Sequence, residues 1–300
     1  MDNQIQSIQN TVICGDSWTI SKTLPSAIAQ AIITSPPYFG HRQYATPSTE
    51  QQALEFGRET DYRDYVTKLA SLFTELKRVL KDDGTVWLNL GDTYRDNQLL
   101  GIPWRVALAL QDDGWFLRSE IIWHKPNAMP SSVKNRPTTA HETLFLFAKS
   151  PQYYYDADAI REPHVTFSEN SKMKGGRNHL GKRNGTPEKG KNQGNGNLHD
   201  GRWDQAFHPL GRNKRTVWEI PLGKFREAHF AVFPPALVET CLLAGSRVGN
   251  VVLDPFMGSG TTAMIAQKHN RHFIGIELMP EYAQMATNRV KQVQPMIPLF

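Results

Sequence analysis

Cysteine is scarce in this chain, whose 300 residues include two, Cys14 and Cys241. Two cysteines are too few for a disulfide framework or for a zinc site built from cysteines. Long apolar runs are missing as well, because no stretch approaches the roughly eighteen apolar residues of a membrane span. The segment from Met1 to Asn10 is polar, so we also expect no secretory signal. These absences favour a globular protein of the cytoplasm, and we assign no metal site.

Negative charge is scarce in one stretch, and this makes the charge distribution uneven. Between Ser168 and Arg215 there are 11 Lys or Arg and 4 Asp or Glu, a local net charge of +7, whereas the whole chain carries +5. The same stretch holds 9 of the 22 glycines and almost no apolar periodicity. It predicts a long, mobile, basic insertion. Such a segment is either a solvated loop or one that binds nucleic acid by releasing counterions from phosphates.

The remaining sequence alternates between strand and helix patterns. Apolar runs bounded by turn residues predict seven strands, near Val12–Cys14, Ala31–Thr34, Thr85–Leu90, Leu117–Trp123, Thr143–Phe147, Asn250–Asp254 and His272–Glu277. Helical spacing predicts helices over Tyr62–Leu80, Pro103–Gln111, Pro235–Leu243, Thr261–His269 and Pro280–Gln292. The alternation indicates an α/β fold, a mostly parallel sheet with helices on both faces. We expect one main domain, residues 1–160 with 216–300, interrupted by the insertion, residues 161–215.

A glycine turn follows the predicted strand that ends at Asp254, where the sequence reads Asp-Pro-Phe-Met-Gly-Ser-Gly-Thr-Thr. Gly258 and Gly260 can adopt backbone angles closed to other residues, and the helix after them points free amide groups at a ligand. Glu277 ends the next strand, 23 positions after Asp254, where a carboxylate can bind both ribose hydroxyls of an adenosine-containing cofactor. A phosphate-binding P-loop would need lysine where Thr261 stands, and a dinucleotide fingerprint would need a third glycine. The turn therefore predicts a site for an adenosine-containing cofactor.

A second motif, Thr-Ser-Pro-Pro-Tyr at residues 34–38, closes the apolar run Ala31–Ile33. It should lie at the carboxyl end of a strand, where open α/β sheets bind ligands. The two prolines fix φ and make a rigid ledge. Ser35 Oγ and the Pro36 carbonyl can accept the hydrogens of an aromatic amine, and Tyr38 can stack on its ring. Localising the amine lone pair in this way is what methyl transfer to such an amine requires.

The ledge and the glycine turn together closely resemble the DNA amino-methyltransferases, bacterial and phage enzymes of restriction-modification and orphan type. The ledge precedes the cofactor turn, which is the permuted order of the beta class. Phe233 and Pro234 are similar to the family's segment that packs against the methionine part of the cofactor, and Gly15 and Asp16 resemble its adenine-contacting turn. The resemblance covers nearly the whole chain outside the basic insertion. It implies a seven-stranded Rossmann-like methyltransferase sheet, S-adenosylmethionine as cofactor and double-stranded DNA as substrate.

The resemblance also implies the site residues. The ledge residues expected to be catalytic are Ser35, Pro36, Pro37 and Tyr38. The residues expected at the cofactor are Asp16, Thr34, Phe233, Pro234, Asp254, Pro255, Phe256, Gly258, Ser259, Gly260, Thr261, Thr262 and Glu277.

Target recognition is expected between the ledge and the Phe-Pro segment, where the basic insertion lies. The segment Trp123–Asn127 resembles a family segment beside the target-base pocket, while His124 and the pair His141 and Glu142 are read as structural or surface residues. The candidates for DNA contact are Lys125, Asn127, Lys172, Lys174, Arg177, Lys182, Arg183, Arg212, Lys214 and Arg215. A cognate restriction endonuclease that is not a physical partner would accompany a restriction-modification enzyme. The recognition sequence and the choice between monomer and homodimer stay open.

A serine at the first ledge position resembles cytosine-N4 enzymes, whereas Asp or Asn is commoner in adenine-N6 enzymes. We therefore expect a target nucleotide flipped from the duplex and methylated at cytosine N4, with adenine N6 as the alternative. Cytosine-C5 chemistry is not expected, because neither Cys14 nor Cys241 follows a proline. An RNA or protein-glutamine methyltransferase would normally begin the ledge with Asn and place it after the cofactor turn. The remaining alternative is a DNA-binding module that has lost activity.

Overall fold

The computed structural model describes residues 6–40, 54–163, 208, 210–223 and 233–296. The chain divides into two units, Met1–Asp156 with Arg215–Phe300, and Ala157–Lys214. Most of the predicted basic insertion, residues 164–207, lies outside the described residues.

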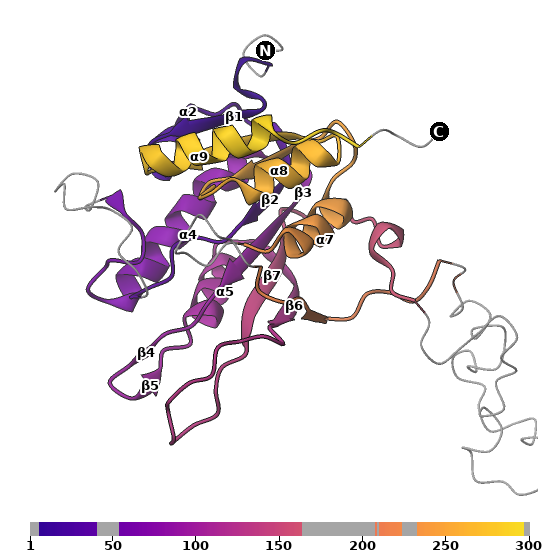
Figure 1. Cartoon of the computed structure of the whole chain (residues 1–300). Helices are drawn as coiled ribbons and strands as arrows, with labels where there is room; N and C mark the ends of the chain where they lie inside the picture. Colours follow the sequence, from indigo (N-terminus) through magenta and orange to yellow (C-terminus); the bar gives the residue numbers. More distant parts are fainter. Residues whose placement is uncertain (1–5, 41–53, 164–207, 209, 224–232, 297–300) are drawn as a thin grey trace, which may run out of the picture. The chain divides into compact units, whose positions relative to one another are not determined.

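One eight-stranded sheet forms the larger unit, in the order β1-β10-β9-β2-β3-β7-β6-β8 (Figure 1). The strands are β1 (Thr11–Cys14), β2 (Ala29–Thr34), β3 (Leu80–Leu90), β6 (Phe116–His124), β7 (His141–Ala148), β8 (Val217–Glu219), β9 (Val251–Asp254) and β10 (His272–Glu277). Strand β7 runs antiparallel to its two neighbours, β3 and β6, and the other pairs are parallel. The seven predicted strands are all present, and the predicted α/β class with a mostly parallel sheet is confirmed.

The eighth strand, β8, corrects the predicted count of seven. It has three residues, of which Trp218 is buried while Val217 and Glu219 are exposed. A run this short carries no periodic signal of its own. Its place is decided by parallel pairing with β6, which aligns Trp218 with Trp123. A separate two-stranded hairpin, β4 (Tyr94–Arg95) with β5 (Gln98–Leu99), was not predicted either.

Six helices in the described part of the larger unit cover the two faces of the sheet. Helices α2 (Ser17–Thr23), α4 (Tyr62–Val79) and α5 (Ile102–Asp112) pack together in one layer, and α7 (Pro235–Gly245), α8 (Thr261–Lys268) and α9 (Pro280–Lys291) form the other (Figure 1). Five of these were predicted within two residues at each end. The sixth, α2, has seven residues and begins at the cap Asp16, whose carboxylate accepts from the Thr19 amide at 2.9 Å. None of the helices in the described part of the chain is long and apolar enough to span a membrane.

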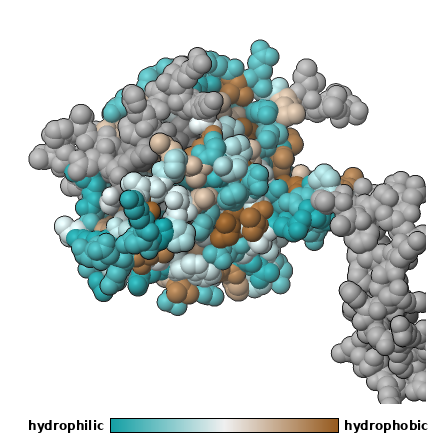
Figure 2. Space-filling model, turned by 60° about the horizontal axis from the view of Figure 1, so that its bottom comes forward, coloured by the Kyte–Doolittle hydropathy of each residue, from teal (hydrophilic) through white to brown (hydrophobic). Residues whose placement is uncertain are grey.

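The core lies between the sheet and α4. All six residues of β2 are buried. The buried face of α4 repeats at helical spacing, as predicted, with Tyr65, Leu69, Leu72, Phe73, Leu76 and Val79. Figure 2 views the molecule with the bottom of Figure 1 brought forward, and on this face hydrophilic side chains surround small hydrophobic islands.

Strand order brings the two ends of the sequence together. The C-terminal strands β9 and β10 lie between β2 and β1 and run parallel to both. The carboxyl ends of β2 and β9 are therefore neighbours at one edge of the sheet. This places the ledge after Thr34 directly beside the glycine turn after Asp254.

Within the smaller unit the described residues form a short 3-10 helix, η1 (Asp158–Ile160), and a bridge between Glu162 and Arg212. Arg161 donates to the Gly211 carbonyl at 3.0 Å. Gly211 has φ +110°, and an added Cβ would lie 2.3 Å from the Glu162 carbonyl oxygen, so only glycine fits this close approach.

Candidate active site

A cavity of about 1190 Å³ opens at the carboxyl edge of the sheet, within the larger unit. It is lined by both predicted motifs. The predicted residues on its wall are Asp16, Ser35, Pro36, Pro37, Tyr38, Phe233, Asp254, Pro255, Phe256, Gly258, Ser259, Thr261, Thr262 and Glu277. Three further predicted cofactor residues, Thr34, Pro234 and Gly260, do not line it.

Asp254 joins the ledge to the glycine turn. Its carboxylate is 3% exposed and accepts hydrogen bonds from Thr34 Oγ1 at 2.6 Å, Thr262 Oγ1 at 2.7 Å and the Phe256 amide at 3.0 Å. Burial raises the pKa of Asp254 to about 6, although these three hydrogen bonds oppose the rise. The carboxylate thus holds β2, β9 and the start of α8 in one arrangement. Thr34 does not line the cavity, and its role is to donate this hydrogen bond to Asp254.

The two turn glycines have different surroundings. Gly260 caps α8 with φ +88°, and a Cβ there would lie 2.8 Å from Cα of Ala286 on α9. Gly258 has φ +52° and open space around the position of a Cβ. Gly260 is therefore required by helix packing, whereas Gly258 leaves room beside the backbone for a ligand.

Glu277 ends β10 inside the cavity, 9% exposed. Its carboxylate accepts from the Gly258 amide at 2.7 Å and the Met279 amide at 2.9 Å. Burial raises the pKa of Glu277 to about 7; the two amides oppose the rise, and the charges of Asp254 and Glu281 add to it.

The turn between β1 and α2 forms another part of the wall. Gly15 donates its amide to the Glu277 carbonyl at 2.8 Å, and this bond brings Asp16 and Ser17 to the cavity. Ser17 Oγ donates to the Pro255 carbonyl and so ties this turn to the glycine turn. Asp16 caps α2 with one oxygen, Oδ2, which accepts from Thr19.

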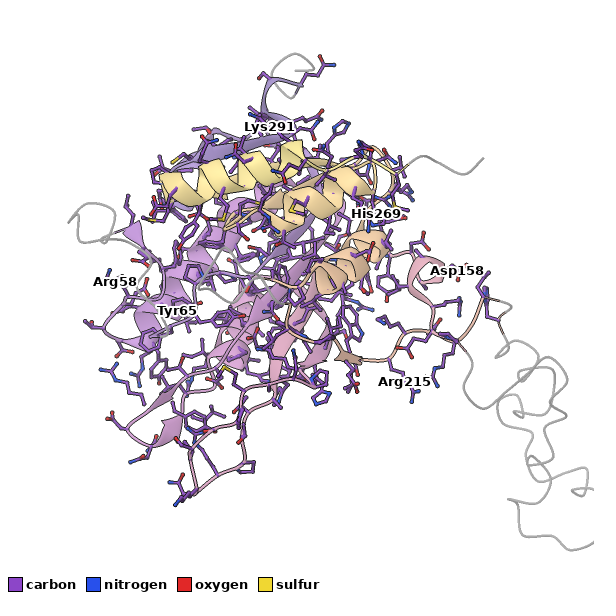
Figure 3. The ribbon with its side chains drawn as sticks, viewed as in Figure 1. Arg58, Tyr65, Asp158, Arg215, His269 and Lys291 are labelled. Carbon is purple, nitrogen blue, oxygen red and sulfur yellow. The ribbon has the colours of Figure 1, made fainter. Side chains whose placement is uncertain are left out.

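The ledge is held from both sides. Tyr65, labelled on α4 in Figure 3, donates its hydroxyl to the Pro37 carbonyl at 2.9 Å. At Gly57, where φ is +87°, an added Cβ would lie 2.6 Å from the carbonyl oxygen of Tyr38. At Gly91 it would lie 2.5 Å from the Tyr38 ring. Backbone without side chains therefore encloses Tyr38 and limits where its ring can lie.

Three polar side chains meet the Tyr38 hydroxyl, and a fourth, Lys125, joins them through Glu142. Tyr38 donates to Glu142 Oε2 at 2.6 Å, and Asn89 Nδ2 lies 2.6 Å from the Tyr38 hydroxyl and 2.7 Å from the same Glu142 oxygen. Ser35 Oγ lies 3.1 Å from the Tyr38 hydroxyl. Lys125 Nζ pairs with the other oxygen of Glu142, Oε1. Burial, with the charge of Glu142, raises the pKa of Tyr38 well above its usual value, so this hydroxyl stays protonated.

The residues predicted to contact DNA lie in different parts of the structure. Lys125 directs its ammonium into the cavity wall toward Glu142, and Asn127 exchanges two hydrogen bonds with the backbone of Leu222. Arg212 and Lys214 both pair with Glu162 in the smaller unit. Arg215, labelled in Figure 3, begins the second segment of the larger unit. The other five, Lys172, Lys174, Arg177, Lys182 and Arg183, lie outside the described residues.

Sequence reasoning missed three site residues. Asn89 is the polar residue near the end of the buried part of β3, Glu142 is the second residue of β7, and Ser17 follows the turn after β1. A polar residue inside an otherwise buried run is a usable signal for Asn89. Nothing in the sequence indicates that Glu142 meets Tyr38, because their contact depends on β7 turning antiparallel beside β3.

The cavity suits a ligand that carries positive charge and hydroxyl groups. Seven lining residues are Asp or Glu, against Lys125 and Arg136 as the Lys or Arg. Thr261 Oγ1 is buried and has no hydrogen-bond partner within the described chain, so a donor remains for a ligand at the glycine turn. No group of three or more His, Cys, Asp or Glu residues in the described ranges could hold a metal ion.

Comparison with known proteins gives consistent matches over nearly the whole chain. A family model described as DNA methylase matches residues 29–288. Type II methyltransferase M.Cfr9I of Citrobacter freundii is 38% identical, over 94% of this chain and 87% of its own. Type II methyltransferase M.SmaI of Serratia marcescens is 37% identical, over 93% of this chain and 90% of its own.

Solved structures share the fold. The PvuII DNA methyltransferase (cytosine-N4-specific) superposes with a TM-score of 0.65 at 20% identity, covering 93% of this chain and 85% of that one. TTHA0409 of Thermus thermophilus, solved in complex with S-adenosyl-L-methionine, superposes with a TM-score of 0.60 at 23% identity, covering 94% and 93%. At these identities the likeness is one of fold: the Rossmann-like sheet described above.

Proposed function

The chain belongs to the N6/N4 DNA methylase family, and from this premise we propose that it transfers a methyl group from S-adenosylmethionine to N4 of cytosine in double-stranded DNA. The observation that carries the proposal is the adjacency of two sites in one cavity. The glycine turn with Glu277 forms one end, and the Ser-Pro-Pro-Tyr ledge forms the other.

The glycine turn is the proposed cofactor site. Glu277 would accept hydrogen bonds from the ribose hydroxyls, and Gly258 would let the backbone approach the ligand closely. Asp16 and Phe233 would contact the adenine and methionine ends, as the family resemblance implies. When bound, S-adenosylmethionine supplies an electrophilic methyl group on a positively charged sulfur. The acidic lining of the cavity stabilises that charge.

The ledge is the proposed target-base site. A base inside a duplex cannot reach the cavity wall, so the nucleotide must leave the stack. The Tyr38 ring would hold the flipped base by stacking, while Ser35 Oγ and the Pro36 carbonyl accept hydrogen bonds from its exocyclic amine. These two acceptors localise the nitrogen lone pair and aim it along the direction of attack. With base and cofactor bound, the filled cavity would exclude water from the same space.

Ser35 supports cytosine N4 over adenine N6. A carboxylate accepts hydrogen bonds more strongly than a neutral hydroxyl, so a ledge that begins with Asp and one that begins with Ser suit amines of different acidity. Adenine N6 stays the alternative, since the family includes both activities. We also propose that residues 161–215 recognise the target sequence. A cognate restriction endonuclease, not physically bound, would accompany the enzyme. The proposal is compatible with either a monomer or a homodimer.

The test is to incubate the protein with methyl-labelled S-adenosylmethionine and mixed-sequence duplex DNA, and to identify the labelled nucleoside by mass. We expect N4-methylcytosine. Ser35→Ala should lower the rate on the order of 100-fold, because an acceptor aimed at the reacting amine is removed. Ser150→Ala, which removes a hydroxyl from the turn after β7, is the matched control and should keep the wild-type rate.

Two other outcomes would contradict the proposal. Labelled N6-methyladenine would keep both sites and overturn the choice of base. Absence of label from DNA would instead favour RNA, protein or an inactive DNA-binding module.

A further inference from the structure

Glu142 is the centre of the polar cluster behind the ledge. Its Oε2 receives hydrogen bonds from the Tyr38 hydroxyl at 2.6 Å and from Asn89 Nδ2 at 2.7 Å, and its Oε1 is paired with Lys125. The side chains of Glu142 and Lys125 are each 15% exposed. A carboxylate with a cation beside it, largely out of solvent, is a strong acceptor that donates nothing.

This acceptor determines the direction of the neighbouring hydrogen bonds. Tyr38 has one hydroxyl proton, and Glu142 takes it. Toward its other neighbours the Tyr38 oxygen can then only accept. Asn89 therefore presents its amino group to Tyr38 and Glu142, because its carbonyl oxygen would be repelled by the carboxylate. Because the Tyr38 proton is already used on Glu142, the hydrogen bond between Ser35 Oγ and the Tyr38 oxygen, 3.1 Å long, takes its proton from Ser35.

The orientation of the Ser35 proton affects what the target base meets. A hydroxyl has one proton and two lone pairs. Asn89 Nδ2 approaches Ser35 Oγ at 3.4 Å, a long contact compared with its two short ones. With its proton directed inward, Ser35 keeps lone-pair capacity toward the cavity.

We propose that Glu142 is a positioning residue: by taking the Tyr38 proton it directs the Ser35 proton inward and leaves Ser35 an acceptor for the exocyclic amine of the target base. The inference rests on the proposed function, since it concerns the same ledge. Lys125 stabilises the negative charge of Glu142 rather than contacting DNA. The sequence had indicated DNA contact for Lys125, through the family resemblance, and a structural or surface position for Glu142.

The surrounding backbone keeps the cluster in this arrangement. Gly91 lies against the Tyr38 ring and Gly57 lies against the Tyr38 carbonyl, at positions where no side chain fits, so backbone bounds Tyr38 on both sides. The raised pKa of Tyr38 keeps its proton available for Glu142. Two readouts follow from this arrangement, one on the reaction and one on the hydroxyl proton itself.

The first experiment compares Glu142→Gln, Tyr38→Phe and the double variant in methyl transfer to DNA. A glutamine at position 142 can donate its amide hydrogen to the Tyr38 oxygen. The Tyr38 hydroxyl is then free to donate to Ser35 Oγ, and this hydrogen bond occupies a lone pair that the target amine would need. We expect kcat to fall about tenfold or more, with the KM for S-adenosylmethionine within about twofold of wild type. Because Glu142 acts through the Tyr38 hydroxyl, its substitution should have little further effect once Tyr38→Phe is present.

The matched control is Glu219→Gln, the same substitution at a 71% exposed side chain on β8 that faces His124. It should keep the wild-type kcat. Thermal melting of every variant checks that the chain is folded. Additive effects of Glu142→Gln and Tyr38→Phe, or an unchanged kcat in Glu142→Gln, would overturn the proposal.

The second experiment does not depend on turnover. Proton NMR of the whole chain should contain a downfield, exchange-protected hydroxyl signal that disappears in Tyr38→Phe and moves upfield in Glu142→Gln. Absence of this signal from the wild type overturns the inference about Glu142. If the signal is present but DNA cytosine is not methylated, the proposed function fails and the hydrogen-bond direction stands.

Discussion

At the scale of single residues, the site depends on carboxylates placed where their charge is costly. Asp254 and Glu277 are both buried, and burial raises both pKa values. Asp254 uses its oxygens on Thr34, Thr262 and the Phe256 amide, so its effect is on the shape of the turn. Glu277 accepts one amide hydrogen bond on each oxygen, which leaves each oxygen a further lone pair.

The pKa of Glu277, about 7, predicts pH-dependent cofactor binding. The ionised carboxylate is the better acceptor for ribose hydroxyls, so affinity should rise with pH through this value. Between pH 6 and pH 8 we expect a gain of about tenfold, measured by calorimetry with S-adenosylmethionine. In the unliganded chain the sign is opposite: the folded state binds the proton more tightly, so this group's contribution to stability falls as the pH rises from 4.5 to about 7.

Glu281→Gln provides the control for this prediction. The charge of Glu281 adds to the raised pKa of Glu277, so its removal should move the rise in affinity to lower pH. Affinity that does not change with pH in either protein would contradict the assignment of Glu277.

At the scale of elements, α4 supports the ledge as well as the core. Its apolar face packs against the sheet, and at its first turn Tyr65 reaches the Pro37 carbonyl. Two consecutive prolines offer no amide donors, so the ledge cannot be held by ordinary backbone pairing. A side-chain donor from a neighbouring helix replaces that pairing.

Tyr65→Phe should therefore lower both stability and activity. The substitution leaves the half-buried Pro37 carbonyl without its donor, at a cost of about 1 kcal/mol in the free energy of unfolding. Urea denaturation measures this cost, and the methylation assay measures the effect on the ledge. Tyr62→Phe, on the same helix and half-buried, is the matched control and should change stability by less than about 0.5 kcal/mol. Equal stability of the two variants would show that the Tyr65 hydroxyl does not support the ledge.

At the scale of the whole molecule, charge is divided between two parts of the sequence. The stretch 168–215 carries +7 while the chain carries +5, so the rest is slightly acidic. The cavity follows this division, since seven of its charged lining residues are Asp or Glu and two are Lys or Arg. A cationic cofactor suits the cavity, whereas the DNA phosphates require positive charge elsewhere.

Neutralising the basic stretch should weaken DNA binding and spare the cofactor. Replacing Lys172, Lys174, Arg177, Lys182 and Arg183 by Gln should reduce the slope of log affinity against log salt by about 0.9 for each phosphate that the protein no longer neutralises. Fluorescence anisotropy with duplex DNA at several salt concentrations measures the slope. Lys81→Gln with Lys291→Gln is the control, because both residues are basic and lie outside the stretch. An unchanged slope would show that the stretch does not bind DNA phosphates and would favour the alternative, a solvated loop.

Sequence reasoning was sufficient for the features that depend on local pattern. Seven apolar runs, five helical patterns and two motifs with fixed spacing are written in consecutive residues, and the structure contains a strand or helix at each of the twelve segments. The fold class followed from these patterns, and so did the position of each motif at the carboxyl end of a strand. Strand order in the structure then places the two motifs side by side.

Only the tertiary structure determined which side chains meet across the sheet. The pairing of β7 with β3 brings Glu142 to Tyr38 and Asn89, residues 104 and 53 positions away in sequence. Parallel pairing with β6 makes a strand of Val217–Glu219, which has no pattern of its own. Contacts of this kind depend on strand order and register rather than on the neighbours of a residue along the chain, so no local pattern contains them.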